Sequence, residues 1–178
     1  MKTKNFGNKK IKIEKLSKKD LSNIKQFQGF INSLIEEDAQ IFLNKKFSLR
    51  EERKWLKTQL NEIENNKKVF LVAQNNHNVV GTACVGLSMG RMSHIGNFEI
   101  AIIKKYRGIG LGTYLLMEAT KLARKKLKTK FIRLSVFSSN KPAVMLYKKF
   151  GFKKVARIPK QVRYKGKLID EIVMLKEL

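Results

Sequence analysis

The sequence predicts a single mixed α/β domain of the α+β type, and three observations support this fold class. Strand and helix patterns follow one another as strand, helix, helix, three strands, helix, strand, helix and two strands. This order implies a mixed sheet of about seven strands, because a doubly wound parallel sheet would alternate strands and helices throughout. The length of 178 residues is typical of one domain, and no repeat or interdomain linker divides it. We therefore expect residues 1–178 to form a single domain.

The first third of the chain is expected to supply one strand and two helices. Residues 1–10 are polar and basic, which indicates a flexible tail, and residues 11–16 alternate as the first strand. Ser17 is an N-cap candidate for a helix with an interruption near Gly29. Residues 48–51 form a capping box, Ser-Leu-Arg-Glu, so a second helix should begin there and end near residues 65–66.

The remaining elements are indicated by alternation, turn residues and helical spacing. Residues 68–74 and 78–88 form a hairpin across a polar turn, and residues 98–103 form an apolar central strand. A helix opens at about Gly112, and residues 131–137 form the next strand. The end of the chain is predicted as a helix after Asn140 and a last hairpin, with strands over 153–158 and 168–175.

The central strand leads into a glycine loop and then a helix. Gly108, Gly110 and Gly112 stand at alternate positions, and a glycine loop at a helix N-terminus exposes backbone N–H groups where the helix dipole is positive. A phosphate group is therefore expected there. Thr113 and Leu115 occupy positions that the dinucleotide fingerprint requires to be glycine, and no Gly-Lys-Ser/Thr ends the loop, so Rossmann and P-loop sites are both excluded. A glycine-rich connection without a ligand is the alternative.

A second motif follows about thirty residues later. Asn140 is a good N-cap, and Pro142 is tolerated in a first helical turn. Ala143, Leu146, Tyr147 and Phe150 fall on one face of the helix, and Gly151 ends it as a C′ residue. The unit reads Asn-x-x-Ala-x-x-x-Tyr-x-x-x-Gly-Phe.

The loop motif Arg-x-x-Gly-x-Gly and the Asn140 unit, in this order and spacing, resemble the GNAT superfamily of acyl-CoA-dependent N-acetyltransferases. The resemblance covers residues 68–178 well and the first 65 loosely. It implies a mostly antiparallel sheet with helices on both faces, and acetyl-CoA as cosubstrate. It also implies that backbone N–H groups of Ile102 and Ile103 bind the pantetheine, that Asn140 contacts the pantetheine arm, and that Tyr147 contacts the cofactor and protonates the leaving sulfur. The residues implied to wrap the pyrophosphate are Arg107, Gly108, Ile109, Gly110, Leu111, Gly112, Thr113 and Tyr114.

The general base departs from the family pattern. Several members carry Glu or His five residues before the asparagine, where this chain has Ser135, and serine cannot act as a base at neutral pH. Glu99 on the central strand is the catalytic candidate, with His94 and ordered water as alternatives. The acidic run at residues 36–38 borders the acceptor cleft in the matching fold, where carboxylates would hold a cationic amine.

Composition limits the function classes further. Cys84 is the only cysteine, so no intrachain disulfide can form, and it is interpreted as a small core residue in a cytoplasmic protein. No segment has the length of a membrane span, and no metal is expected. The net charge of +25 indicates weak non-specific polyanion binding.

The function predicted is acetyl transfer from acetyl-CoA to a primary amine of a protein or peptide, by a monomer or homodimer. The alternatives are a small-amine acceptor (a polyamine, an amino acid or an antibiotic) and a catalytically silent, basic nucleic-acid-binding protein on the same fold.

Overall fold

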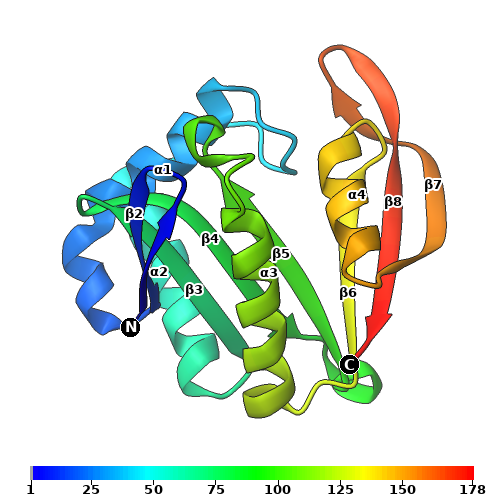
Figure 1. Ribbon diagram of the computed structural model, residues 1–178, viewed down its shortest axis with the longest axis horizontal. Helices are drawn as coiled ribbons and strands as arrows, with labels where there is room; N and C mark the ends of the chain where they lie inside the picture. The colour runs from blue at the N-terminus through cyan, green and yellow to red at the C-terminus, as the bar shows by residue number, and fades with distance from the viewer. Residues whose placement is uncertain (1) are drawn as a thin grey trace.

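The structure, a computed structural model, describes residues 2–178. Over these residues all strands join one eight-stranded sheet in the order β1-β2-β3-β4-β5-β6-β8-β7 (Figure 1). The elements in chain order are β1 (Lys2–Phe6), β2 (Lys9–Lys15), η1 (Lys18–Asn23), α1 (Ile24–Glu36), α2 (Leu49–Glu64), β3 (Lys68–Asn75), β4 (Asn78–Leu87), η2 (Gly90–Met92), β5 (Ile95–Ile102), η3 (Lys104–Tyr106), α3 (Leu111–Leu122), η4 (Ala123–Leu127), β6 (Phe131–Phe137), α4 (Lys141–Lys149), β7 (Lys153–Tyr164) and β8 (Lys167–Glu177).

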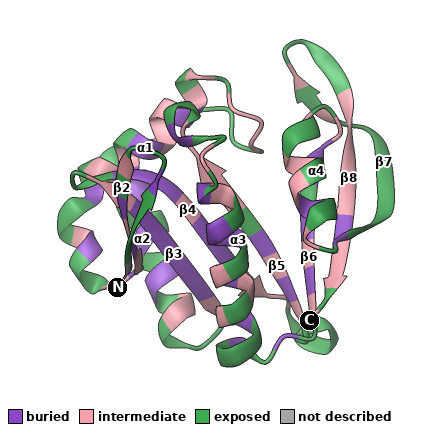
Figure 2. Ribbon diagram, viewed as in Figure 1, coloured by how far each residue is buried: buried purple, intermediate pink, exposed green. Residues whose placement is uncertain are grey.

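Two apolar cores lie on opposite faces of the sheet. The larger core packs α3 and α4 against one face, with Leu115 and Leu116 fully buried. The second core packs α1 and α2 against the other face through Phe27, Leu34 and Leu56. Figure 2 shows the buried stretches concentrated on β3, β4, β5 and the inner side of α3. The prediction of a mixed, mostly antiparallel sheet with helices on both faces is confirmed.

The sheet has one strand more than the sequence predicted, because residues 2–6 are not a tail. β1 pairs antiparallel with β2 through the tight turn at Gly7, which has a φ of +59°. Phe6 is the reason for this order: its ring is buried against Tyr114 of α3, with ring centroids 5.7 Å apart. The basic residues around Phe6 led to the prediction of a tail, whereas the packing of this one aromatic side chain holds residues 2–6 as a strand.

The helices on the α1 and α2 side begin at the predicted caps, with one difference. The Asp20 carboxylate accepts hydrogen bonds from the Ser17 N–H and hydroxyl, but these cap a short 3₁₀ turn, and α1 itself starts at Ile24. α1 runs through Gly29 without the expected interruption. The capping box of Ser48 and Glu51 opens α2 as predicted.

The pairing of β5 with β6 positions the site. It is parallel, and it covers only residues 95–97 of β5 against 131–133 of β6. Beyond Asn97 β5 stays with β4 and beyond Arg133 β6 stays with β8, so the two strands separate (Figure 1). The sheet therefore opens into a V at its centre, with α3 on one arm and α4 on the other.

The C-terminal elements follow the prediction closely. Asn140 caps α4, and Gly151 ends it with a φ of +83°. β7 and β8 form the last hairpin, longer than predicted, around Lys165 and Gly166. Within the part of the chain that the structure describes, none of the helices combines the length and the apolar character that crossing a membrane requires.

Candidate active site between β5 and β6

One side of the V is the free edge of β5. The Ile103 N–H donates to the carbonyl of Val80 on β4, at 3.2 Å. Because hydrogen-bonding groups alternate along a strand, the polar backbone groups of Ile100 and Ile102 point away from β4, toward the space that β6 has left. The N–H of Ile102 therefore points into the V, whereas the N–H of Ile103 is used inside the sheet.

The glycine loop ends at the N-terminus of α3, at the mouth of the V. Gly108 and Gly110 have φ values of +75° and +87°, which L-amino acids other than glycine rarely adopt. The first hydrogen bond within α3 runs from the Tyr114 N–H to the Gly110 carbonyl, so the N–H groups of residues 111–113 precede it. A Cβ added at Gly108 would meet nothing within 4 Å, so a ligand can approach this backbone closely. The loop has the form of an anion site.

Arg107 supports this loop from behind. Its Nε donates to the Ile102 carbonyl at 2.7 Å, and its guanidinium forms an ion pair with Glu37. The second Glu37 oxygen accepts the Lys104 N–H at 2.9 Å. Glu37, at the C-terminal end of α1, therefore contacts Lys104 and Arg107, which lie at the two ends of the η3 turn that precedes the glycine loop. Arg107 holds the loop in shape, and its guanidinium points to a carboxylate of its own chain.

The β1 strand borders the same loop. The Lys4 ammonium lies 4.5 Å from the centroid of the Tyr114 ring, and the Lys9 ammonium 5.5 Å from that of Tyr106. Tyr114 and Leu111 are buried, so their side chains pack while their backbone lines the helix N-terminus. Two cations, Lys4 of β1 and Lys9 of β2, therefore lie over the tyrosine rings on either side of the glycine loop, and both come from residues expected to be a tail.

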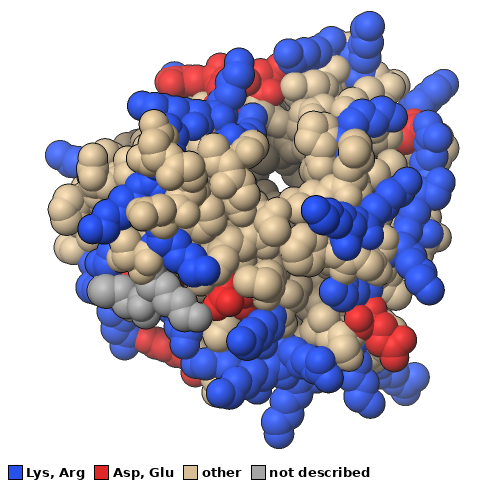
Figure 3. Space-filling view, in the orientation of Figure 1, with Lys and Arg blue, Asp and Glu red and all other residues tan. Residues whose placement is uncertain are grey.

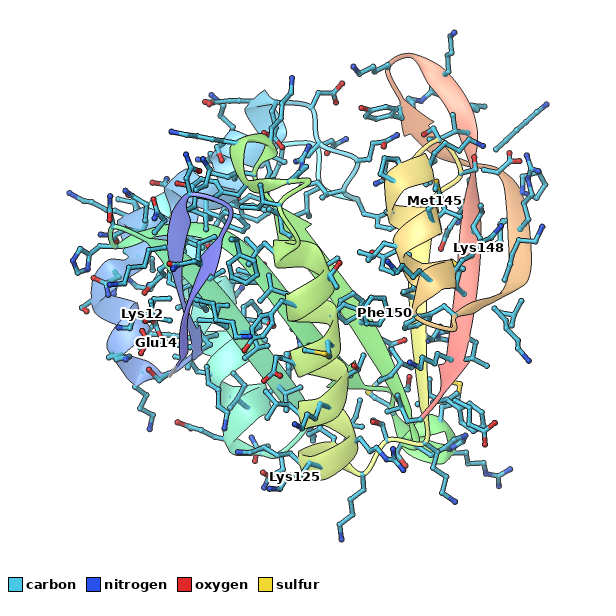
Figure 4. The ribbon with its side chains drawn as sticks, viewed as in Figure 1. Lys12, Glu14, Lys125, Met145, Lys148 and Phe150 are labelled. Carbon is cyan, nitrogen blue, oxygen red and sulfur yellow. The ribbon has the colours of Figure 1, made fainter. Side chains whose placement is uncertain are left out.

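The opposite arm of the V is α4. The Asn140 side-chain oxygen accepts the Ala143 N–H at 3.2 Å, which fixes the helix start. Tyr147 lies on the inner side, with its ring 6.3 Å from Phe98 of β5 and 5.9 Å from Phe152. Burial of the Tyr147 phenol raises its pKa to about 12, so the hydroxyl keeps its proton at neutral pH. On the outer side, Met145 and Lys148 point away from the sheet (Figure 4).

Glu99 lies on the other face of the sheet from Tyr147. It pairs with Cys84 of β4, and its carboxylate is 3.7 Å from the Cys84 sulfur. Burial, and next the charge of Glu99, raise the pKa of the Cys84 thiol, so the thiol stays protonated and is a poor nucleophile. Ser135 is exposed on β6, whereas His94 lies at the closed end of the V, where its carbonyl accepts the Lys130 N–H.

The open end of the V is bridged by the segment between α1 and α2. The Phe42 ring packs 5.0 Å from Phe137 of β6, and Phe137 lies 5.6 Å from Tyr164 of β7. The Tyr164 hydroxyl donates to the Asp38 carbonyl at 2.9 Å, and Gln40 donates to the Ser139 hydroxyl at 2.6 Å. In Figure 3 the surface is hollowed between α3 and α4, and a narrow opening passes through the molecule there.

These bridging residues were missed in the sequence. Phe42, Phe137 and Tyr164 are far apart in the chain, and each looks like an ordinary packing residue. The acidic run did come to the border of the V, but its three carboxylates pair with basic side chains, namely Glu36 with Lys46, Glu37 with Arg107 and Asp38 with Lys165. They are thus used mainly to hold the chain together.

Comparison with solved structures places this architecture among known acetyltransferases. A GNAT-family acetyltransferase from Streptococcus pneumoniae superposes with a TM-score of 0.82 at 26% identity, covering 94% of this chain and 99% of that one. The acetyltransferase yncA from Salmonella typhimurium, solved with its cofactor acetyl-CoA, gives a TM-score of 0.78 at 20% identity and covers 94% of each chain. The second likeness is evidence of a shared fold.

Sequence relatives match shorter stretches of the chain at higher identity. The L-amino acid N-acetyltransferase AaaT of Escherichia coli is 30% identical over 105 residues, which are 58% of this chain and 65% of the relative. An N-alpha-acetyltransferase of Sulfurisphaera tokodaii is 42% identical over 57 residues, 32% of this chain and 34% of the relative. The chain thus spans between about one third and two thirds of these relatives' lengths.

The family model described as Acetyltransferase (GNAT) family matches residues 31–152, a range that contains both arms of the V, the glycine loop and the Asn140 helix. The match covers more than half of the chain, and the chain belongs to the GNAT family of acetyltransferases.

Proposed function

We propose that this protein is an acetyl-CoA-dependent N-acetyltransferase that moves an acetyl group directly to a primary amine. The observation that carries the proposal is the V between β5 and β6, with the N–H groups of the α3 N-terminus at its mouth and a free strand edge inside it. An extended ligand with a phosphate at one end would bind with that phosphate at the glycine loop and with the rest of its length along β5.

The residues proposed to hold acetyl-CoA act mostly through their backbone. The N–H groups of residues 108–113 would bind the pyrophosphate, with Lys4 adding positive charge nearby. The Ile102 N–H would bind the pantetheine arm from β5, and α4 would border it through Asn140 and Tyr147. When bound, acetyl-CoA supplies an acetyl group as a thioester.

Two side chains are proposed to move protons during transfer. The amine must lose a proton as its nitrogen bonds to the acetyl carbon, and Glu99 on the acceptor face of β5 would take that proton, directly or through water. The carbon–sulfur bond breaks as the new bond forms, and the Tyr147 hydroxyl would donate to the departing sulfur. Its raised pKa keeps the hydroxyl in the protonated form that this role requires.

The acceptor is proposed to be a primary amine of a peptide or protein. The archaeal relative named above is an N-alpha-acetyltransferase, and the Escherichia coli relative acts on L-amino acids according to its name. Both support amine acetylation, and a small amine is the alternative acceptor. We place the reaction in the cytoplasm, since a chain with Cys84 as its single cysteine does not depend on disulfides.

The phosphate site can be tested with a pair of substitutions at Thr113. This residue is exposed in the first turn of α3, where a carboxylate stabilises the helix but would repel a phosphate. Thr113→Glu should therefore keep or raise the melting temperature and weaken acetyl-CoA binding at least about tenfold in calorimetry, while Thr113→Gln binds as the wild type does. Equal affinities for all three proteins would refute the site.

Activity is tested by release of CoA thiol with a panel of amines. We expect acetyl-CoA-dependent turnover with at least one peptide whose N-terminus is free. Purified protein that binds acetyl-CoA but acetylates none of the amines would refute the proposed reaction.

A further inference from the structure

The carboxylates of this protein are unevenly paired. The chain has 39 lysines and arginines and only 14 aspartates and glutamates, so nearly every acid can find a basic partner. The acids that form ion pairs among the described residues are Glu14, Glu36, Glu37, Asp38, Glu51, Glu62, Glu64 and Asp170. Glu99 and Glu171 are among the acids with no ion pair to another described residue. Glu99 lies on β5, at the edge of the V, and Glu171 lies on β8, the strand next to β6.

The register places Glu171 on the same face as Glu99. Glu171 of β8 lies directly opposite Phe137 of β6, and residues directly opposite each other in a pair of strands point to the same face. Phe137 contacts Phe42 and Tyr164 on the side of the sheet that α1 and α2 cover. Glu99 is on this side too, because it contacts Cys84 of the second core.

The neighbouring acid shows the contrast. Asp170 points to the other face, where it accepts hydrogen bonds from the Arg157 side chain and the Lys160 N–H. Lys165, the basic residue nearest in the hairpin turn, pairs with Asp38 at 3.5 Å. Arg133, on the face of Glu171, donates to Asn97 instead. Arg133 and Lys165 are therefore committed elsewhere, and the half-buried Glu171 carboxylate forms no ion pair among the described residues.

The surroundings of Glu171 suit a positive charge. Aromatic faces attract cations, and a cation between a ring and a carboxylate is held by both. Phe137, directly opposite Glu171, supplies one ring, and the rings of Tyr164 and Phe42, the latter residue 57% exposed, both pack against Phe137. A protein with a net charge of +25 would repel a cationic acceptor unless the site itself supplied negative charge.

We propose that Glu171, together with the rings of Phe137 and Tyr164, binds a second positive charge of the acceptor, separate from the amine that is acetylated. This inference rests on the proposed acetyl transfer at Glu99. The two glutamates are two strand spacings and about two residues apart, which gives a Cα separation of at least about 12 Å. The acceptor class is thus a chain with a free amine and a second ammonium well beyond the reach of an α-amino acid: a peptide with a lysine near its N-terminus, or a long diamine.

The test compares acceptors that differ only in the second charge. One pair is a tetrapeptide with lysine at its second position against the same peptide with norleucine, and the other is 1,8-diaminooctane against octylamine. Because a hydrogen-bonded charge typically gives about a ten- to hundredfold effect, wild-type kcat/KM should favour the charged member of at least one pair by that factor. A preference confined to the diamine identifies the small polyamine as the source of the charge, and one confined to the peptide identifies lysine.

Glu171→Gln should bring the preferred ratio to within about threefold of one, with kcat/KM for the uncharged member unchanged. Glu171→Lys should reverse the preference, and it serves as a second variant if the first loses structure. Glu177→Gln is the matched control, since it removes the same charge from the exposed far end of β8, opposite Phe131.

Two outcomes overturn the inference: a wild type without charge preference in either pair, or a preference that survives Glu171→Gln. A wild type that releases no CoA with any amine would instead refute the proposed function, so the two failures are distinguishable.

Discussion

Gly96 should not tolerate even one added methyl group, because it stands in the short stretch where β5 and β6 pair. A Cβ built at Gly96 would lie 2.5 Å from Val85 Cγ1, 3.0 Å from Ile132 Cδ1 and 3.1 Å from Thr129 Cγ2. Its φ lies outside the left-handed region, so the obstacle to alanine is space and not backbone conformation. Val85 and Ile132 are themselves fully buried and cannot move aside without disturbing the larger core.

The expected cost of Gly96→Ala follows from this crowding. Forcing extra carbon into a well-packed core costs about 1–3 kcal/mol, and contacts this short favour the upper half of that range. For a protein of this length about 2 kcal/mol corresponds to a drop in melting temperature of about 4–8 °C. The assay is thermal unfolding followed by circular dichroism, with urea unfolding for the free energy.

Gly29→Ala is the matched control, because the same substitution is made in open space. Gly29 lies within α1 and a Cβ there would meet nothing within 4 Å. Alanine is favoured over glycine in a helix by about 0.5–1 kcal/mol, so this variant should melt about 1–4 °C higher than the wild type. A Gly96→Ala protein that melts at or above the wild-type temperature would refute the packing described at the base of the V.

Three further predictions concern a buried acid, the Tyr147 hydroxyl and the surface charge. Burial raises the pKa of Glu52 from 4.5 to about 7, so the folded state holds its proton more tightly than the unfolded state and the protein loses stability as pH rises from about 4.5 through about 7. Glu52→Gln should therefore stabilise by about 2 kcal/mol at pH 8 and by little at pH 4.5, and an equal change in melting temperature at both pH values would contradict the assigned burial. Tyr147→Phe should lower turnover about a hundred- to ten-thousandfold with acetyl-CoA affinity nearly unchanged, and a variant with wild-type turnover would make Tyr147 a packing residue only. Retention on heparin should fall steeply with salt and show no sequence preference with DNA or RNA, because the basic side chains, among them Lys125 at the far end of the α3 segment (Figure 4), are spread over the surface; selective nucleic-acid binding at high salt would contradict this.

The elements that carried local signals could be predicted from the sequence almost to the residue. The strand at 131–137 and the helix after Asn140 follow from strict alternation and from a cap, a helical stripe and a terminal glycine, all of which act within a dozen residues. The glycine loop was predicted for the same reason. Each of these features is decided by neighbours in the chain.

The missed features depend on contacts between distant segments. β1 is ordered by Phe6 against Tyr114, more than a hundred residues away, and no pattern in residues 1–10 reveals that ring contact. Which amide of Ile102 and Ile103 is free depends on the register with β4, and the position of His94 at the closed end depends on where β6 begins. That Glu171 lacks an ion pair to another described residue can be seen only from the tertiary structure, once the partners of the other carboxylates are known.

The two outer strands of the sheet have a consequence for how this protein meets other copies of itself. β1 and β7 are the edges, and an unpaired edge is a template for intermolecular strand addition. β1 is five residues long, and its exposed residues are polar. β7 is long, but it carries Lys153, Lys154 and Arg157, its pairing shifts register twice, and Pro159 lacks an N–H for a further ladder. Both edges therefore discourage growth of the sheet into fibrils, even in a molecule whose central strands are almost wholly apolar.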